Sequence, residues 1–301
     1  MKPVLHLLTG CTAVGKTEWA LRWAETYGAE IISCDSLLFY RGMDIGTAKP
    51  TPVERARVPH HLIDICEVTE RMDVTQYVAL AKKAAEGIAA RGQRVLVTGG
   101  SGFYLKAFLS AVADDVAVGD EVRTAVAQLS FAEAVEELHR LNPGGLGNLD
   151  VANPRRVSRA LERCRVSGKT FATLAAEFAA RPSPFADWSI ALTQLDRTPE
   201  DLAQRIELRV AAMIRAGLVG EVKTLVARGL KENPSAAGAI GYREVIGCLD
   251  GAKSEADLVA KIAQNTRALV KKQRTWFRTQ LPAHRVIAAE EAAVDRLFVV
   301  D

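Results

Sequence analysis

The 301-residue sequence has few cysteines, no long apolar run and no large excess of either charge. No apolar stretch approaches the roughly 18 residues that a membrane-spanning helix needs, and residues 1–10 carry no small-residue cleavage pattern, so we expect a soluble, cytoplasmic protein. The five cysteines are scattered without a CxxC pair, which argues against a disulfide framework and against a cysteine-ligated zinc site. With 39 basic and 36 acidic residues, the net charge is only +3. The apolar fraction of 49% predicts a globular protein with a large core and excludes disordered and fibrous classes.

Strand and helix patterns alternate along most of the sequence. Apolar runs that indicate buried strands occupy residues 4–9, 29–34, 94–98, 189–195 and 285–288. Helices are expected over residues 17–27, from 73 to about 91, from 103 onward and from 198 to 217. Asp73 and Gln76 form a capping-box pattern at the start of one of these helices. Repeated strand–loop–helix units of this length predict an α/β fold in which helices flank a mostly parallel sheet.

The strand signals disappear between residues 119 and 188. The pattern there is helical, with Asn153 as an N-cap and Pro154 at the first helical position of one segment. We therefore expect a P-loop NTPase-like core over residues 1–118 and 189–301, and an inserted all-helical domain over residues 119–188.

The strongest local motif matches the P-loop pattern GxxxxGK[ST] and lies between a predicted strand and a predicted helix. Its residues are Gly10, Cys11, Thr12, Ala13, Val14, Gly15, Lys16 and Thr17. In such a loop, backbone N–H groups and the helix N-terminus bind a diphosphate, and the lysine adds a positive charge. The Thr17 hydroxyl can reach Mg²⁺, the expected cofactor, or a phosphate oxygen. The alternative is a chance glycine-rich turn.

Two polar residues follow neighbouring predicted strands. Asp35 comes at the carboxyl edge of the sheet, where parallel folds bind ligands, so it can act as a general base or hold Mg²⁺. The alternative role for Asp35 is to cap the following turn. Ser101 lies in a Gly-Gly-Ser-Gly turn that lets the backbone approach a ligand closely, or that forms a plain helix N-cap.

Arginines recur at helical spacing in two places. Arg205 and Arg209 project from the same side of one predicted helix, where one of them could bind a pyrophosphate. Arg155, Arg159 and Arg163 form a basic stripe on a helix of the insertion, which suits the phosphates of a nucleic acid. A solvated charged face is the alternative interpretation for both groups.

Further motifs resemble those of a known family. They occupy residues 31–36, 40–50, 59–64, 99–106, 159–162, 240–243 and 266–278. With the P-loop, and in order along nearly the whole chain, they resemble the bacterial tRNA dimethylallyltransferases, also called tRNA isopentenyltransferases. The resemblance implies transfer of a dimethylallyl group from dimethylallyl diphosphate to N6 of adenine-37, beside the anticodon of tRNAs that read codons beginning with U. Cys11 stands where the family usually has proline.

The resemblance also implies roles for individual residues. Asp35 matches the general base that takes a proton from the N6 amine, and Lys16 and Thr17 match residues that bind the diphosphate. Arg209 matches the arginine that stabilises the departing pyrophosphate together with Mg²⁺, and Ser101 occupies a position near the flipped base. The positions that match tRNA-facing residues are Asp35, Ser36, Leu37, Leu38, Ser101, Arg123, Arg155, Arg156, Val157, Ser158 and Arg159.

Three rival functions share part of this pattern. A P-loop small-molecule kinase would transfer phosphate from ATP and use Asp35 to activate a hydroxyl, but it does not explain the helical insertion or the motif at residues 40–50. An adenylate isopentenyltransferase would act on free AMP, but such enzymes usually lack a full tRNA-binding insertion. A non-enzymatic P-loop RNA-binding protein is the third. We expect a monomer whose partners are the tRNA anticodon stem-loop and dimethylallyl diphosphate, with no membrane partner.

Overall fold

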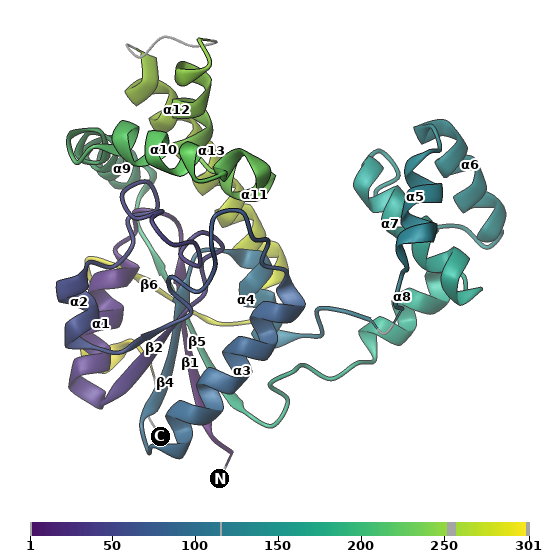
Figure 1. Ribbon diagram of the computed structural model, residues 1–301. Coiled ribbons are helices and arrows are strands. Elements are labelled where there is room, and N and C mark those ends of the chain that lie inside the picture. The colour runs from purple at the N-terminus through teal and green to yellow at the C-terminus, as the bar shows by residue number, and fades with distance from the viewer. Residues whose placement is uncertain (1, 115, 252–256, 299–301) are drawn as a thin grey trace. The chain divides into compact units, whose positions relative to one another are not determined.

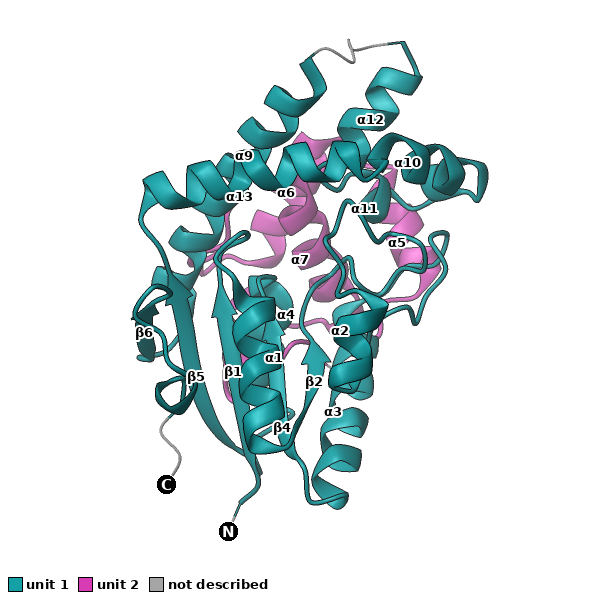
Figure 2. Cartoon of the chain, turned by 90° about the vertical axis from the view of Figure 1, so that its left-hand side faces the viewer, with its two compact units in different colours: residues 1–109, 184–301 teal, residues 110–183 magenta. Residues whose placement is uncertain are grey.

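The computed structural model describes residues 2–114, 116–251 and 257–298. The chain divides into two compact units, which Figure 2 shows in different colours. Unit 1 comprises residues 1–109 and 184–301, and unit 2 comprises residues 110–183. None of the helices within the described ranges is both long and apolar enough to span a bilayer.

Unit 1 is built on a parallel sheet that has six strands among the described residues. They are β1 (Val4–Gly10), β2 (Ala29–Ser33), β3 (His60–His61), β4 (Arg94–Gly99), β5 (Ser189–Asp196) and β6 (Arg285–Ala288). Their order across the sheet is β3-β2-β4-β1-β5-β6. Every residue of β2 and all but the first of β1 are buried, which is typical of strands covered on both faces. The predicted α/β fold is confirmed, and among the described strands the two-residue edge strand β3 was not expected.

Helices cover both faces of this sheet and its carboxyl edge. They are α1 (Lys16–Tyr27), α2 (Pro52–Arg57), α3 (Val74–Ala90), α4 (Gly102–Leu109), α9 (Pro199–Arg215), α10 (Leu218–Ala227), α11 (Pro234–Ala237), α12 (Tyr242–Leu249) and α13 (Leu258–Gln280), with 3₁₀ turns η1 (Leu230–Glu232) and η3 (Val294–Arg296). Figure 1 shows α1 and α2 on one side of the sheet, α3 and α4 on the other, and α9 to α13 beyond the carboxyl ends of the strands. The predicted capping box at Asp73 and Gln76 is present.

Unit 2 contains four helices among its described residues: α5 (Asp120–Ala127), α6 (Phe131–Leu141), α7 (Pro154–Ser167) and α8 (Phe171–Ala179). Its core includes Leu138, Val157 and Leu161, each with 0% exposure. The Asn153 side chain accepts from the Arg156 N–H and Pro154 occupies the first turn of α7, as predicted. The helical character of the insertion is thereby confirmed.

Candidate active site

The loop between β1 and α1 has a backbone that only certain residues can adopt. Gly10 has φ 153° and Gly15 has φ 102°, both in a region that favours glycine. A Cβ atom at Gly10 would lie 2.5 Å from the carbonyl oxygen of Leu195 at the end of β5. The close approach of the loop to its neighbouring strand therefore requires glycine, and it brings the free backbone N–H groups of the α1 N-terminus to the carboxyl edge of the sheet.

Two arginines that follow β5 donate hydrogen bonds to carbonyl oxygens of this loop. The Nε atom of Arg197 donates to the carbonyl oxygen of Val14 and that of Arg205 donates to the carbonyl oxygen of Ala13, each at 2.8 Å. Arg197 is itself oriented by the carboxylate of Asp201, at 2.8 Å. The sequence pattern was compatible with two roles for Arg205, pyrophosphate binding or a position on a solvated helix face. In the structure it contacts the loop and lines the adjoining cavity.

Gln273 of α13 also contacts this loop. No local sequence signal assigned a role to this residue. Its Oε1 atom accepts from the Thr12 N–H at 3.0 Å, and its Nε2 atom donates to the Gly100 carbonyl oxygen at 2.8 Å. One side-chain amide thus joins the loops that follow β1 and β4. Both hydrogen-bonding ends of the amide are used, so neither leucine nor glutamate can replace it without loss.

Lys16 is a cation without a carboxylate partner in the part of the chain that the structure describes. Its Nζ atom donates to the carbonyl oxygens of Gly10 and Cys11, both at 2.9 Å. Burial lowers the pKa of Lys16 to about 8, while the nearby Asp35 carboxylate opposes that decrease. An anion bound next to this ammonium group would compensate for the free-energy cost of burying its charge. The loop is therefore suited to a diphosphate.

A cavity of about 440 Å³ opens beside the loop. The predicted site residues that line it are Thr12, Ala13, Gly15, Lys16, Thr17, Asp35, Leu38 and Arg209. Three of them, Lys16, Asp35 and Arg209, come from different elements, so the fold has assembled the residues predicted for the diphosphate and for proton transfer. Gly10, Cys11 and Val14 lie in the same loop but do not line this cavity.

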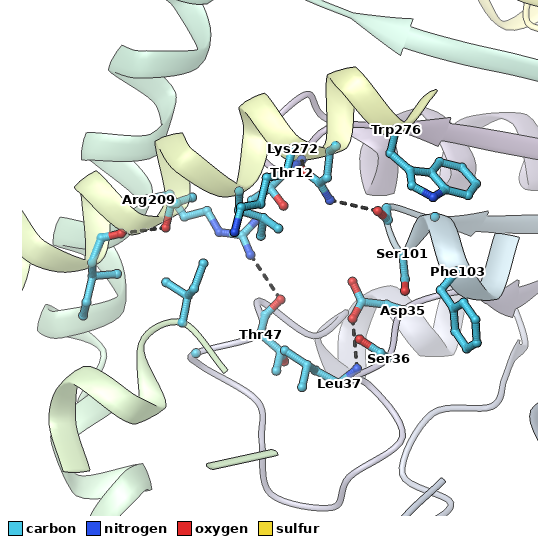
Figure 3. Close-up of a pocket in the computed structure, with 18 of the residues that line it drawn as sticks. Thr12, Asp35, Ser36, Leu37, Thr47, Ser101, Phe103, Arg209, Lys272 and Trp276 are labelled. Atoms are coloured by element: carbon cyan, nitrogen blue, oxygen red, sulfur yellow. Dashed lines mark hydrogen bonds between the residues drawn. The ribbon is translucent and has the colours of Figure 1, made fainter. Parts of the chain in front are cut away.

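A second cavity, of about 390 Å³, adjoins the first (Figure 3). Both cavities are lined by the same five residues, Thr12, Asp35, Thr47, Gly100 and Arg209. The second is further lined by the predicted residues Ser36, Leu37 and Ser101, and by apolar side chains from α4, α9 and α13. The cavity beside the P-loop and a second one with apolar walls therefore meet at a carboxylate and a guanidinium.

The two groups at this junction are held by backbone contacts. The Oδ1 atom of Asp35 accepts from the Leu37 N–H at 3.0 Å, which is the turn-capping contact considered above. The Nη2 atom of Arg209 donates to the Thr47 carbonyl oxygen at 3.1 Å. Burial lowers the pKa of Arg209, and the Asp35 carboxylate opposes this. Because capping uses one carboxylate oxygen of Asp35, the capping role and a role as base are compatible.

Aromatic side chains form one wall of the second cavity. Phe103 on α4 is 61% exposed, and Trp276 on α13 lies against the start of α4, where a Cβ at Gly102 would be 2.4 Å from its ring. Figure 3 shows both rings beside Ser101 and Asp35. Trp276 is half-buried. Aromatic rings that remain accessible beside a polar pair can stack on a flat base. The C-terminal segment that carries Trp276 is thus part of the site.

The remaining predicted residues lie in unit 2. Arg155, Arg156 and Arg159 are exposed on α7, whereas Arg163 pairs with Asp114 at 2.9 Å. The Arg123 side chain forms an exposed pair with Asp120, at 3.1 Å, and Ser158 is half-buried. The side chain of Val157 is fully buried in the core of unit 2. The expectation that Val157 faces tRNA is therefore wrong for its side chain, because α7 turns that position inward.

The described residues contain no cluster of three or more His, Cys, Asp and Glu side chains suited to a metal ion. Mg²⁺ needs few protein ligands when phosphate oxygens and water complete its octahedral shell. Thr17 and Asp35 both line the loop cavity, so oxygen donors of the type that Mg²⁺ prefers are present there. The residues fit an ion that arrives with a diphosphate.

Comparisons with known proteins agree with this geometry. The model of the IPP transferase family matches residues 38–280. A tRNA dimethylallyltransferase of Opitutus terrae is 67% identical over 288 residues, which cover 96% of this chain and 94% of that protein. The solved structure of a tRNA Δ(2)-isopentenylpyrophosphate transferase from Staphylococcus epidermidis is similar with a TM-score of 0.69 and 29% identity, covering 97% of this chain and 95% of that one. The solved structure of a eukaryotic dimethylallyltransferase acting on tRNA has the same fold, with a TM-score of 0.84 and 22% identity. That match covers 95% of this chain and 74% of the eukaryotic chain.

Proposed function

The chain belongs to the IPP transferase family, whose members are prenyltransferases that modify tRNA, and from that premise we propose that it transfers a dimethylallyl group from dimethylallyl diphosphate to N6 of adenine-37 in tRNAs that read codons beginning with U. The observation that best supports this reaction is the junction of the two cavities at Asp35 and Arg209. One cavity suits a diphosphate, and the other, with apolar and aromatic walls, suits a prenyl chain and a purine. The product is N6-isopentenyladenosine.

The loop residues act on the leaving group. As the bond between the dimethylallyl carbon and the diphosphate oxygen breaks, negative charge develops on the pyrophosphate. The free N–H groups at the start of α1, the ammonium group of Lys16 and the guanidinium of Arg209 stabilise that charge most where they are already oriented. The Lys16 and Arg209 side chains are held by hydrogen bonds to backbone carbonyl oxygens, which supports this role.

Asp35 acts on the nucleophile. The exocyclic amine of adenine is a poor nucleophile because its lone pair is delocalised into the ring. As N6 bonds to the dimethylallyl carbon, the carboxylate of Asp35 accepts the N6 proton. Ser101 lies on the same side of the cavity and is suited to hydrogen-bond the base (Figure 3).

Mg²⁺ is the proposed cofactor. The Thr17 hydroxyl and the diphosphate oxygens would hold it, and when bound it neutralises charge on the pyrophosphate. Thr17 lines the loop cavity beside Lys16, which supports this assignment.

tRNA binding is assigned to both units. An adenine stacked within the anticodon loop must be extruded to reach Asp35, which costs a few kcal/mol. Phe103 and Trp276 offer stacking surface for the extruded base, and the exposed arginines Arg155, Arg156 and Arg159 offer charge to RNA phosphates. Residues 119–188 are the proposed tRNA-binding domain. The proposed working form is a monomer, and its place of action is the cytoplasm, where tRNA is found.

The test is an incubation of purified protein with Mg²⁺, dimethylallyl diphosphate and an unmodified anticodon stem-loop bearing A36-A37-A38, followed by mass spectrometry of the RNA. We expect a gain of one dimethylallyl group, lost when adenine-37 is replaced. Transfer to free AMP at a comparable rate would favour the adenylate isopentenyltransferase. No transfer, with ATP consumed when small hydroxyl acceptors are supplied, would favour the kinase.

A further inference from the structure

A single carboxylate on α10 binds the backbone of the loop at residues 44–46. The Oε2 atom of Glu221 accepts from the N–H groups of Asp44, at 3.0 Å, and Ile45, at 2.7 Å. Its Oε1 atom accepts from the Gly46 N–H at 3.1 Å and from the Tyr242 hydroxyl at 2.6 Å. Four donors thus converge on one carboxylate, and each of its oxygens accepts two hydrogen bonds.

Tyr242, at the start of α12, closes this arrangement from the other side. Its side chain has 0% exposure, and a Cβ at Gly46 would lie 2.5 Å from its ring. Burial and the adjacent Glu221 carboxylate both raise the pKa of Tyr242, so its hydroxyl stays protonated and donates. Glycine at residue 46 is required because the tyrosine ring occupies the space of a side chain.

The far end of the same loop is held by a buried lysine. The Nζ atom of Lys49 pairs with Asp44 at 2.7 Å and with Asp64 at 2.6 Å, and it donates to the Tyr40 carbonyl oxygen at 2.8 Å. The Lys49 N–H also donates to the Asp44 carbonyl oxygen, at 3.0 Å. The loop is therefore fixed at both ends, and Glu221 is its attachment to α10.

This loop leads directly into the active site. The next residue, Thr47, lines both cavities, and its carbonyl oxygen is the acceptor for Arg209. A shift of the backbone at residues 44–46 therefore moves the atom that orients the guanidinium. Arg209 has to meet charge that develops during the reaction, so its orientation is worth more in the transition state than in the ground state.

We propose that Glu221, together with Tyr242, is a positioning residue: by fixing the backbone at residues 44–46 it holds the Thr47 carbonyl oxygen that orients Arg209 toward the leaving pyrophosphate. The inference rests on the proposed function, since it assigns that leaving group. It gives a structural reason for two of the sequence motifs without an assigned role, at residues 40–50 and 240–243.

The decisive substitution is Glu221→Gln, because it keeps the size of the side chain and removes its ability to accept on both sides. Whichever way the amide is turned, its NH₂ group faces donors instead of supplying an acceptor. Tyr242→Phe is the milder variant, since the ring still packs on Gly46 and the three backbone bonds remain. Glu86→Gln, an exposed residue of α3, changes the charge equally and serves as the control.

Each variant is made in two backgrounds, one that retains Arg209 and one that carries Arg209→Ala. Two quantities are measured for each protein. One is the single-turnover rate of dimethylallyl transfer to the stem-loop at saturating substrates, with the KM for the stem-loop. The other is the dissociation constant of inorganic pyrophosphate with Mg²⁺, by calorimetry. We expect Glu221→Gln to slow turnover and weaken pyrophosphate binding about tenfold, and Tyr242→Phe about threefold, with stem-loop KM and the Glu86→Gln control unchanged. With Arg209→Ala, neither variant lowers the rate further.

Two results would overturn the proposal: a wild-type rate and pyrophosphate affinity in Glu221→Gln, or an equal loss with and without Arg209, which would make the effect independent of that residue. If a melting curve shows that Glu221→Gln does not fold, Tyr242→Phe decides by the same criteria. A wild-type protein that transfers no dimethylallyl group contradicts the proposed function, and the pyrophosphate titrations then still decide whether Glu221 acts through Arg209.

Discussion

Three cations that line the cavities of unit 1 donate to main-chain carbonyl oxygens, whereas predicted RNA-binding arginines of unit 2 are exposed to solvent. Of the residues that line the cavities, Lys16, Arg205 and Arg209 donate to carbonyl oxygens. On α7, the exposed arginines are Arg155, Arg156 and Arg159. A cation held by neutral carbonyl groups keeps its charge available and its direction fixed, which suits chemistry on a small anion. An exposed arginine keeps its reach and its rotamer freedom, which suits the long-range attraction of a polyanion.

The difference predicts two kinds of response to substitution. Changes around the cavities should alter the rate or the affinity for the small ligand, with little dependence on salt. Changes on α7 should alter tRNA affinity in a salt-dependent way and leave the chemical step alone. The following experiments test that separation, from the largest expected effect to the smallest.

Asp35→Ala should lower turnover by roughly 10²–10⁴-fold and leave tRNA affinity near that of the wild type, because a general base acts in the transition state. Single-turnover kinetics and filter binding measure the two quantities. Asp35→Asn is the matched variant, since it keeps size and the contact with the Leu37 N–H while losing basicity. Wild-type turnover in either variant would remove Asp35 from its proposed role.

Gln273→Glu should weaken binding of dimethylallyl diphosphate about tenfold, because a carboxylate would face the Gly100 carbonyl oxygen in place of an amide donor. The new negative charge also lies close to the diphosphate cavity. Gln264→Glu, at an exposed position of the same helix, makes the same change in charge and should leave the affinity unchanged. Equal effects of the two variants would show that charge alone is responsible.

Replacing Arg155 and Arg159 with alanine should weaken stem-loop binding several-fold and reduce the slope of log K against log salt by about one per lost phosphate contact. Turnover at saturating RNA should not change. Arg163→Ala on the same helix is the control, because its guanidinium is already paired with Asp114. An unchanged slope in the double variant would assign Arg155 and Arg159 to a solvated face.

The smallest effect concerns pH. Because burial lowers the pKa of Lys16 to about 8, a bound anion should raise that pKa and the complex should take up a fraction of a proton near pH 8. The protonated fraction of Lys16 in the free protein falls about threefold between pH 7.5 and 8.5, so its share of pyrophosphate affinity should weaken in that window. Calorimetry in two buffers of different ionisation enthalpy measures the uptake. Lys16→Arg keeps the charge at all these pH values and should abolish the uptake that Lys16 contributes.

The fold could be predicted where the signal is local. The strand that runs into the P-loop, the capping box at Asp73 and the start of α7 at Asn153 each depend on residues a few positions apart. The edge strand β3 and the six-residue α2 were missed because such short elements contain too few residues for a period to be visible.

The site was predicted only in part for a related reason. The P-loop, Asp35 and Arg209 carry recognisable patterns, and the fold brings them to the same two cavities. Gln273 and Glu221 act through contacts with backbone atoms far away in the sequence, among them the N–H groups of Thr12, 261 residues from Gln273, and Ile45, 176 residues from Glu221. On their own helices they have the appearance of ordinary polar residues. Gln273 lies within the motif at residues 266–278, but the nearby sequence assigns a role to neither residue. Val157 shows the opposite error, since the segment predicted to face tRNA contains one residue whose side chain the helix turns into the core.

The contact between Thr12 and Gln273 also bears on how the protein is made. The ribosome synthesises Gln273 261 residues after Thr12. At about 5–20 residues per second, that interval is roughly 10–50 s. The central strand β1 likewise cannot pair along both of its edges until β5 (Ser189–Asp196) has been synthesised. During that interval a nascent chain carries the P-loop sequence without the side chain that joins it to the loop after β4, and a truncated product that ends before α13 lacks this residue.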